Sequence, residues 1–264
     1  MNHHRRGAGE PLVLIHGIGS RWQVWEPVID ALAEHHDVIA ADVPGFGRSP
    51  SLDPGVAPTV FALADAFERF FEELGLRRPH VAGNSMGGGI VLELARRGAV
   101  GSATAISPVG FWTSRERRFS QLVLGLSHDI PVPVRRTVLP LTSVGAGRTL
   151  LMGHIFARPW RIPAADARST LEDFWAAPAF SAALAAFGGY VFRAGHELRL
   201  VPVTVAWGSR DRLLLFGRQA PRARRALPDA HHVTLTGLGH TPFYDDPEMV
   251  AGAMLRGTGA VRAA

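Results

Sequence analysis

The sequence predicts an α/β fold in which helices flank a mostly parallel sheet and a helical cap is inserted. Short apolar runs alternate with segments of helical periodicity along most of the chain, which is typical of parallel sheets. The alternation stops between residues 111 and 199, a stretch too long for an ordinary loop. The 264 residues, 47% of them hydrophobic, are enough to bury a full core.

The first part of the core, residues 1–110, is expected to supply most of the sheet. Its strands are short apolar runs at residues 12–15, 37–42, around 81 and 103–106. Its helices are expected at residues 22–33, 60–74 and 88–97. In the helix at 60–74, Phe67 and Phe70 share an apolar stripe opposite Glu68, which indicates one buried face.

Residues 111–199 are expected to form the helical cap, and residues 200–264 to complete the core. The last two strands are expected at 201–206 and 232–235. The aromatic residues of the cap can line a pocket or form its own core, and the second interpretation is favoured because apolar side chains at helical spacing usually pack internally. They are Trp112, Phe156, Trp160, Phe174, Trp175, Phe180 and Phe187.

Residues 83–87 read Gly-Asn-Ser-Met-Gly, the G-x-S-x-G pattern, between a strand-like run and a helical one. A serine on so tight a turn is held in a strained conformation, and side chains at Gly83 and Gly87 would collide with the neighbouring strand and helix. The helix that follows aims its N-terminal amides at Ser85. Ser85 is therefore the candidate nucleophile, the alternative being a serine in an ordinary glycine-rich turn.

Two further motifs follow expected strands, at the edge where α/β sheets bind ligands. Residues 207–212 read WGSRDR, and residues 237–240 read GLGH. Asp211 is placed to orient a histidine, and His240 to approach Ser85, in the chain order Ser, Asp, His. Asp245 and Asp246 could also orient a histidine but are better interpreted as helix N-terminal caps.

The loop after the first expected strand reads His-Gly-Ile-Gly at residues 16–19. Its glycines allow the backbone amide of Ile18 to point into the site, where it would form a two-donor oxyanion hole with the amide of Met86. His16, Gly17 and Asn84 flank these groups and are the candidate substrate contacts. His16 is more simply a support for the oxyanion loop.

With these motifs the chain resembles the α/β-hydrolase superfamily, specifically its capped esterase-like group. The resemblance covers residues 12 to about 110 and 201 to the end, and it includes DVPGFGRS at 42–49 and GLGHTPFYDDPE at 237–248. It implies covalent catalysis by Ser85, with His240 as base and then acid and Asp211 as its orienter. The amides of Ile18 and Met86 would stabilise the tetrahedral intermediate.

The start of the chain departs from that superfamily, whose members usually have a β-hairpin before the HG motif. His16 lies too close to Met1 for two full strands. We expect the hairpin to be shortened or missing, with the first strand of the sheet absent and the second in question, unless the true start lies further upstream. The exposed edge is then a candidate contact for a homo-oligomer.

Composition narrows the partners of the protein. No segment reaches the about 18 uncharged apolar residues of a membrane span, and the first ten residues lack the apolar region of a signal peptide, so we expect a cytoplasmic protein. The net charge is +5, and all 28 basic residues that contribute to it are arginine. The basic run at 218–225 has no aromatic residues between its arginines. It indicates a solvated helix face, with a small-molecule substrate and no nucleic acid as partner. The absence of cysteine excludes disulfides and a thiolate nucleophile.

No cofactor or metal is expected. Gly17-Ile18-Gly19 and Asp42 resemble part of a dinucleotide fingerprint, but Trp22 occupies the position of the third glycine. None of the 12 histidines has a metal-ligand spacing such as H-E-x-x-H. Six of them are most simply surface or strand-flanking residues: His3, His4, His35, His36, His231 and His232.

Three functions remain open. The favoured one is a serine hydrolase that cleaves carboxylic esters of small to medium apolar substrates. A carbon-carbon hydrolase of the ring-cleavage type is the second, since residues 83–88 resemble its elbow, although Thr241 follows His240 where such enzymes show tryptophan. A non-catalytic ligand receptor is disfavoured because all three triad positions are occupied. Epoxide hydrolysis and dehalogenation are disfavoured because those subfamilies have an aspartate at the elbow.

Overall fold

The computed structural model describes residues 1–193, 195–198 and 201–261. Within them, one sheet runs in the order β1-β3-β2-β4-β5-β6-β7. Its strands are β1 (His3–Arg6), β2 (Pro11–Ile15), β3 (Asp37–Ala41), β4 (His80–Asn84), β5 (Ser102–Ile106), β6 (Val203–Gly208) and β7 (His231–Leu235). Every pairing is parallel except that of β1 with β3. The expected mostly parallel sheet is confirmed.

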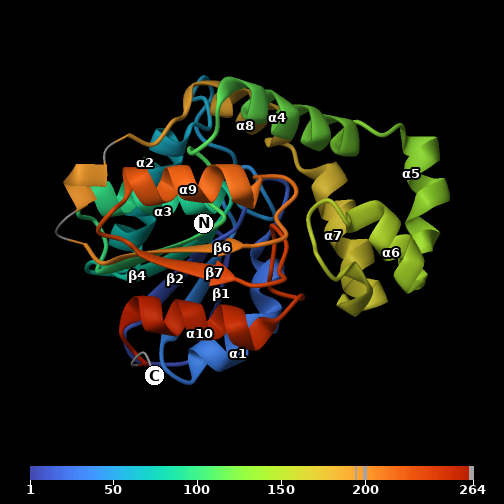
Figure 1. Ribbon diagram of the computed structural model, residues 1–264. Helices are drawn as coiled ribbons and strands as arrows, with labels where there is room; N and C mark the ends of the chain where they lie inside the picture. Colours follow the sequence, from blue (N-terminus) through green and yellow to red (C-terminus); the bar gives the residue numbers. More distant parts are fainter. Residues whose placement is uncertain (194, 199–200, 262–264) are drawn as a thin grey trace.

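Helices cover both faces of this sheet (Figure 1). The helices of the core are α1 (Glu26–Ala33), α2 (Val60–Glu73), α3 (Met86–Arg96), α9 (Phe216–Ala226) and α10 (Pro247–Thr258). The sequence of β2 is apolar throughout because both of its faces are covered by helices. Leu12 and Leu14 pack with α1 and α10, whereas Val13 and Ile15 pack with α2 and α3. A parallel strand buried on both faces has no polar side.

The hairpin expected to be shortened or missing is reduced to one antiparallel strand before the HG motif. This strand, β1, pairs with β3 from His3 opposite Ala41 to Arg6 opposite Val38. The Arg5 guanidinium also donates to the Asp37 carboxylate, with a shortest distance of 2.6 Å. His3 and His4 therefore lie within a strand. Of the two strands of the usual hairpin, the second, whose presence was in question, is present as β1.

Two details of the core differ from the sequence prediction. The strand expected at 201–206 begins at Val203 and ends at Gly208. His36, expected at the surface or flanking a strand, does directly precede β3 but is buried at 2% exposure, and its ring contacts Glu10 O at 3.1 Å and Thr258 Oγ1 at 2.8 Å. This histidine therefore joins the end of α1 to the end of α10.

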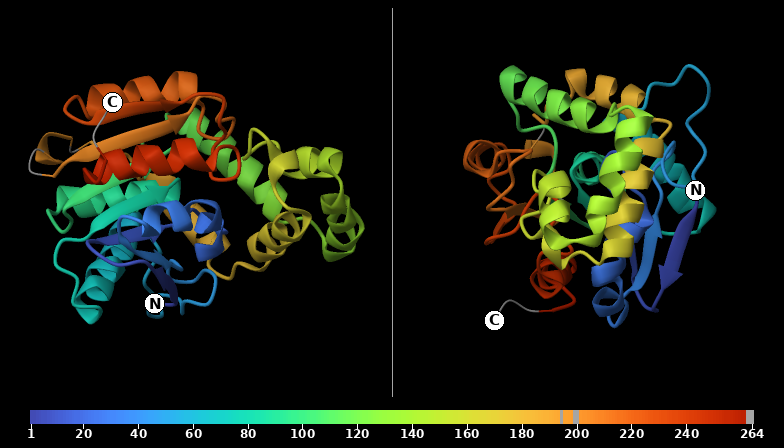
Figure 2. Two further views of the ribbon diagram at one scale, coloured as in Figure 1. Left: turned by 90° about the horizontal axis from the view of Figure 1, so that it is seen from below. Right: turned by 90° about the vertical axis from the view of Figure 1, so that its right-hand side faces the viewer.

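Helices occupy the chain between β5 and β6. They are α4 (Ser114–His128), α5 (Val132–Val138), α6 (Gly145–Met152), α7 (Ala164–Ala176) and α8 (Phe180–Ala186). Short 3-10 helices in the same stretch are η2 (Leu139–Ser143), η3 (Pro159–Arg161), η4 (Phe187–Gly189) and η5 (Gly195–Leu198), whereas η1 (Trp22–Trp25) lies in the core directly before α1. Figure 1 and the left view of Figure 2 show α5, α6 and α7 projecting beyond the sheet. The expected limit of the cap at residues 199 and 200 lies outside the described residues.

The aromatic side chains of this insertion have three kinds of environment. Trp112 and Phe187 belong to the main core beside the sheet, and not to a separate core of the cap as expected. Phe180 packs against Phe174 with ring centroids 5.0 Å apart. Trp160 is 52% exposed, so it packs neither in a core nor against the pocket.

Among the described helices, none combines the length and the apolarity that crossing a membrane would need.

Candidate active site

Ser85 occupies a strained turn between β4 and α3. Its φ of 58° and ψ of −112° lie outside the usual regions for a residue with a side chain. The turn is held because Ser85 N donates to Ile106 O at 2.9 Å, and Ser85 O accepts from Gly89 N at 3.1 Å. A side chain at Gly83 would overlap the backbone of Gly87, which agrees with the steric reason given for the motif.

Asp211 follows β6, and His240 follows β7. His240 Nδ1 lies 2.8 Å from Asp211 Oδ2, and both side chains are at most 4% exposed. The carboxylate also accepts from Trp207 Nε1 and from the amides of Leu213 and Leu214, at 2.8 to 3.2 Å. Because a carboxylate only accepts, Nδ1 of His240 carries the proton, and Nε2 is left as the acceptor.

Asn84 ties the histidine loop to the strand that precedes Ser85. Its Nδ2 donates to His240 O at 2.9 Å and to Ile106 O at 3.1 Å, and its Oδ1 accepts from Thr241 Oγ1 at 3.3 Å. The Asn84 amide borders the cavity beside Ser85, but these contacts occupy it. Its geometry therefore supports a positioning role more directly than the expected substrate contact.

The backbone amides of Ile18 and Met86 are two candidate donors for an oxyanion hole. Among the described residues, neither has a hydrogen-bond partner, and Met86 is the first residue of α3. Gly17 lies against the nucleophile, since a Cβ built on it would be 3.2 Å from Ser85 Cβ. The missing side chain thus allows the HGIG loop to approach Ser85.

His16 holds the Gly17–Ile18 peptide from the opposite side. Its Nε2 accepts from Val43 N at 2.9 Å, so Nδ1 carries the proton and donates to Gly17 O at 2.7 Å. In a trans peptide the N–H points away from the C=O, so the Ile18 amide is directed away from His16. Burial lowers the pKa of His16 to about 4, which keeps the ring neutral. The expected substrate contact of His16 is not supported, because both ring nitrogens are occupied and the ring does not line the cavity.

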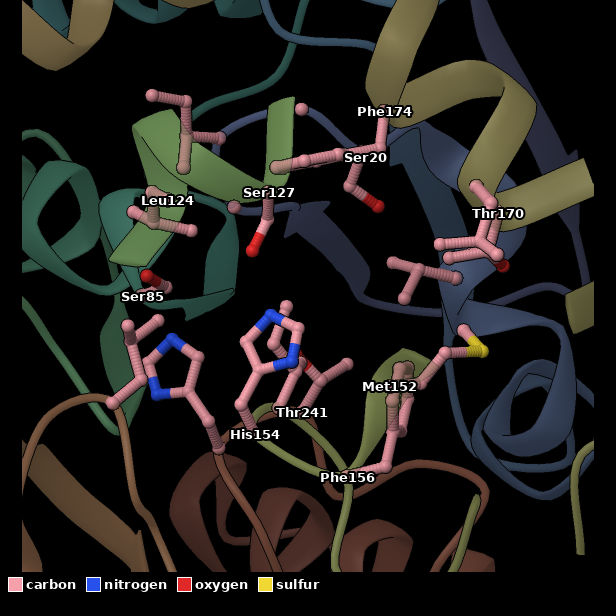
Figure 3. Close-up of a pocket in the computed structure, with 18 of the residues that line it drawn as sticks. Ser20, Ser85, Leu124, Ser127, Met152, His154, Phe156, Thr170, Phe174 and Thr241 are labelled. Carbon is pink, nitrogen blue, oxygen red and sulfur yellow. The ribbon is translucent and has the colours of Figure 1, made fainter. Parts of the chain in front are cut away.

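Ser85 and His240 border one cavity of about 930 Å³, counting the space open at its mouth. Within the described residues the Ser85 hydroxyl makes no hydrogen bond, and such contacts often tighten only when substrate binds. Much of the wall is apolar and comes from the insertion between β5 and β6, including Leu124, Met152, Phe156, Phe174 and Trp175. Figure 3 shows Leu124, Met152, Phe156 and Phe174 around the open space beside Ser85. No acid or arginine lines this cavity in the described part of the chain.

Asp245 joins the histidine loop to the segment at residues 155–158. It is fully buried and accepts from Gly239 N at 2.7 Å, Arg158 N at 2.7 Å and Ala157 N at 3.1 Å. Burial raises the pKa of this carboxyl, against the opposing effect of its backbone donors. The expected role as a helix cap is wrong for Asp245 and holds only for Asp246, which accepts from Met249 N at 3.0 Å.

The Asp42 carboxylate is occupied by backbone donors of the surrounding loops. The Asp42 carboxylate accepts from Trp22 N at 2.8 Å and from Arg48 N at 2.9 Å, so it stabilises the loop after β3. In the described residues, no three acidic or histidine side chains converge in a way that could hold a metal ion. Sequence reasoning missed His154, Ser127 and Thr170 on the cavity wall, because no motif surrounds them.

Comparison with known proteins identifies the family. The model of the alpha/beta hydrolase family matches residues 12–253, so the chain belongs to that family. The epoxide hydrolase EphH of Mycobacterium tuberculosis is 30% identical over 190 residues, which cover 70% of this chain and 88% of that protein. An uncharacterised protein of the same species is 28% identical over 257 residues, covering 91% of this chain and 73% of its own length.

Solved structures share the fold over nearly the whole chain. A membrane phospholipase A, described as a bacterial virulence factor, has a TM-score of 0.74 and 28% identity, covering 98% of this chain and 83% of that one. A thermophilic esterase from Thermogutta terrifontis has a TM-score of 0.74 and 22% identity, covering 97% and 91%. These matches confirm the α/β-hydrolase fold.

Proposed function

We propose that this chain is a serine hydrolase that cleaves carboxylic esters of small to medium apolar substrates through an acyl-enzyme. The observation that carries the proposal is the placement of Ser85 on one cavity with His240, whose Nδ1 is 2.8 Å from Asp211 Oδ2. The amides of Ile18 and Met86, which have no hydrogen-bond partner among the described residues, support it further. Together these groups have the donors and acceptors that acyl transfer needs.

In the proposed reaction, Ser85 Oγ attacks the ester carbonyl while Nε2 of His240 accepts its proton. The amides of Ile18 and Met86 donate to the negative oxygen of the tetrahedral intermediate. His240 then returns the proton to the leaving alcohol, and the acyl group stays on Ser85. A water molecule, deprotonated by His240, attacks that ester; the bond between the acyl carbon and Ser85 Oγ breaks, and His240 returns the proton to Ser85 Oγ as the acid leaves. Asp211 keeps the imidazole oriented throughout.

The inserted helices are proposed to act as a cap that selects apolar substrates. Leu124 of α4, Met152 of α6 and Phe174 of α7 all border the cavity that contains Ser85. A wall of this kind gains free energy from burying hydrocarbon and offers little to a charged group. Since no arginine lines the cavity in the described residues, a dienoate carboxylate would lack a counter-charge, which disfavours ring-cleavage chemistry.

A substrate panel tests this proposal. The purified protein is assayed with p-nitrophenyl butyrate, with a ring-cleavage dienoate and with an aromatic epoxide, since one relative is named as an epoxide hydrolase. We expect turnover of the ester and none of the epoxide, because Ser85 stands at the elbow. Selective turnover of the dienoate would favour carbon-carbon hydrolysis instead, and failure to hydrolyse any ester would reject the proposal.

A further inference from the structure

His154 places a polar ring in the otherwise largely apolar wall of the Ser85 cavity. It lies just after α6, and Figure 3 shows its ring rising into the centre of the cavity, between Ser85 and Met152. Its Nε2 is buried and has no hydrogen-bond partner among the described residues. Leaving such a nitrogen unpaired costs free energy, so a ligand atom that pairs with it would be favoured there.

The backbone on both sides of His154 is fixed. Ile155 O accepts from His240 N at 2.8 Å and from Thr241 N at 3.2 Å. On the other side, Gly153 O accepts from Arg212 Nη1 at 3.2 Å. The backbone that carries His154 is therefore held in a defined position relative to the histidine loop, as a binding subsite requires.

The surroundings of His154 select the kind of group that it can bind. Burial and the neighbouring His240 lower the pKa of His154, so its ring is neutral at neutral pH. A neutral imidazole offers one donor and one acceptor and no charge. Because no arginine lines the cavity in the part of the chain described, a carboxylate has no counter-charge there. A carbonyl, hydroxyl or ether oxygen fits these conditions.

We propose that His154 forms a polar subsite that binds a neutral oxygen of the substrate at a distance from the scissile ester. This inference rests on the proposed ester hydrolysis and narrows its substrates to oxygen-bearing aliphatic esters. The subsite acts through binding and takes no part in the transfer of the acyl group. A plain alkyl ester fills the same space but leaves the His154 nitrogen unpaired.

Two pairs of esters, matched in length, test the subsite. In the alcohol part, 2-methoxyethyl butyrate replaces one methylene of butyl butyrate with oxygen; in the acyl part, p-nitrophenyl 3-methoxypropanoate does the same for p-nitrophenyl pentanoate. We expect the ratio of kcat/KM, oxygenated over alkyl, to fall about tenfold in His154→Phe for one pair, as loss of a buried hydrogen bond predicts. The responding pair shows which part of the substrate reaches His154.

Control variants keep the outcome decisive. His154→Gln retains a hydrogen-bonding side chain and should restore part of the ratio, whereas Thr170→Val, on the same cavity, should leave it unchanged. Equal ratios in wild type and His154→Phe for both pairs would overturn the subsite, and so would a loss confined to Thr170→Val.

Binding separates this inference from the proposed function. In Ser85→Ala, calorimetry compares the Kd of each oxygenated ester with that of its alkyl partner, with and without His154→Phe. If no ester is hydrolysed but the His154-dependent preference appears, the proposed function fails and the subsite stands. If esters are hydrolysed and the preference is absent, the subsite fails alone.

Discussion

The Gly17–Ile18 peptide is held by its carbonyl oxygen, which accepts from His16 Nδ1 at 2.7 Å. The same peptide supplies the Ile18 amide on its opposite side, so one buried ring sets the direction of a proposed oxyanion donor. His16 is itself oriented by Val43 N, which donates to Nε2 at 2.9 Å. Its neutral form is essential, because a protonated ring could not accept from Val43.

Replacing His16 should therefore reduce kcat. In His16→Phe the peptide loses its anchor, and the Ile18 amide is no longer fixed toward the intermediate. We expect kcat for p-nitrophenyl butyrate to fall by roughly 10²- to 10³-fold, the effect of losing one oxyanion donor, with little change in KM. A variant with wild-type kcat would show that Ile18 is not such a donor.

The low pKa of His16 also predicts how stability depends on pH. Its folded-state pKa of about 4 lies below the ordinary value of 6.5, so the unfolded chain binds a proton first as the pH falls. His16 thus stabilises the fold above pH 6.5, and this contribution is lost between pH 6.5 and 4, at up to about 1.4 kcal/mol per pH unit. Urea unfolding should show a shallower pH dependence in His16→Phe; identical slopes would contradict the assignment.

The sequence identifies some site residues and not others for a local reason. Ser85, Asp211 and His240 each follow a strand in a glycine-containing turn, so a short stretch of sequence places them at one sheet edge. Asp245 and Asp246 are adjacent acids before a proline and look alike in sequence. The folded chain gives them different roles, because Gly239 and the distant residues 157–158 donate to Asp245 and not to Asp246.

At the scale of elements, the histidine loop and the segment after α6 form one hydrogen-bonded unit. Ile155 O accepts from two amides of the histidine loop, and Asp245 accepts from one amide of that loop and two of the segment. Arg158 and Arg161 also donate to Asp245 O, at 3.0 and 2.7 Å. The wall of the cavity that includes His154 is thereby fixed to the loop that carries His240.

Removing the Asp245 carboxylate should loosen this unit. Asp245→Ala leaves three backbone amides without their acceptor, and we expect a loss of roughly 2 to 4 kcal/mol in the free energy of unfolding together with a lower kcat. Asp246→Ala is the matched control: it loses a helix cap worth about 1 kcal/mol and should keep its kcat. Urea unfolding and steady-state kinetics measure both, and equal effects at the two positions would contradict the distinction.

At the scale of the whole molecule, the sheet was more predictable than the insertion. The parallel strands β2, β3 and β6 are almost entirely buried, so their sequences are largely apolar. Strand β1 has the sequence HHRR, which gives no such signal and depends on pairing with β3 and on the contact of Arg5 with Asp37. The inserted helices carry ordinary apolar patterns, so their sequence does not distinguish a residue that lines the cavity from one that packs in their own core.

Self-association at the β1 edge and a cytoplasmic location stay predictions.

The proposed cap predicts a limit on substrate length. Each buried methylene gains about 0.8 kcal/mol, so kcat/KM should rise about fourfold per carbon until the cavity is full, and then fall. Butanoyl to hexanoyl esters should exceed both acetate and long lipid chains. Assays with p-nitrophenyl esters of increasing acyl length measure this profile. A flat profile, or one still rising at long chains, would argue against an enclosed pocket.

The central claim is that Ser85 is the nucleophile, and covalent labelling tests it most directly. The protein is treated with a fluorophosphonate, and the modified peptide is identified by mass spectrometry. We predict one adduct on Ser85 that is absent in Ser85→Ala, with a fall of roughly 10⁴-fold in kcat for that variant and little further loss when His240 and Asp211 are also replaced. Labelling of Ser85→Ala to the same extent as wild type would contradict the account.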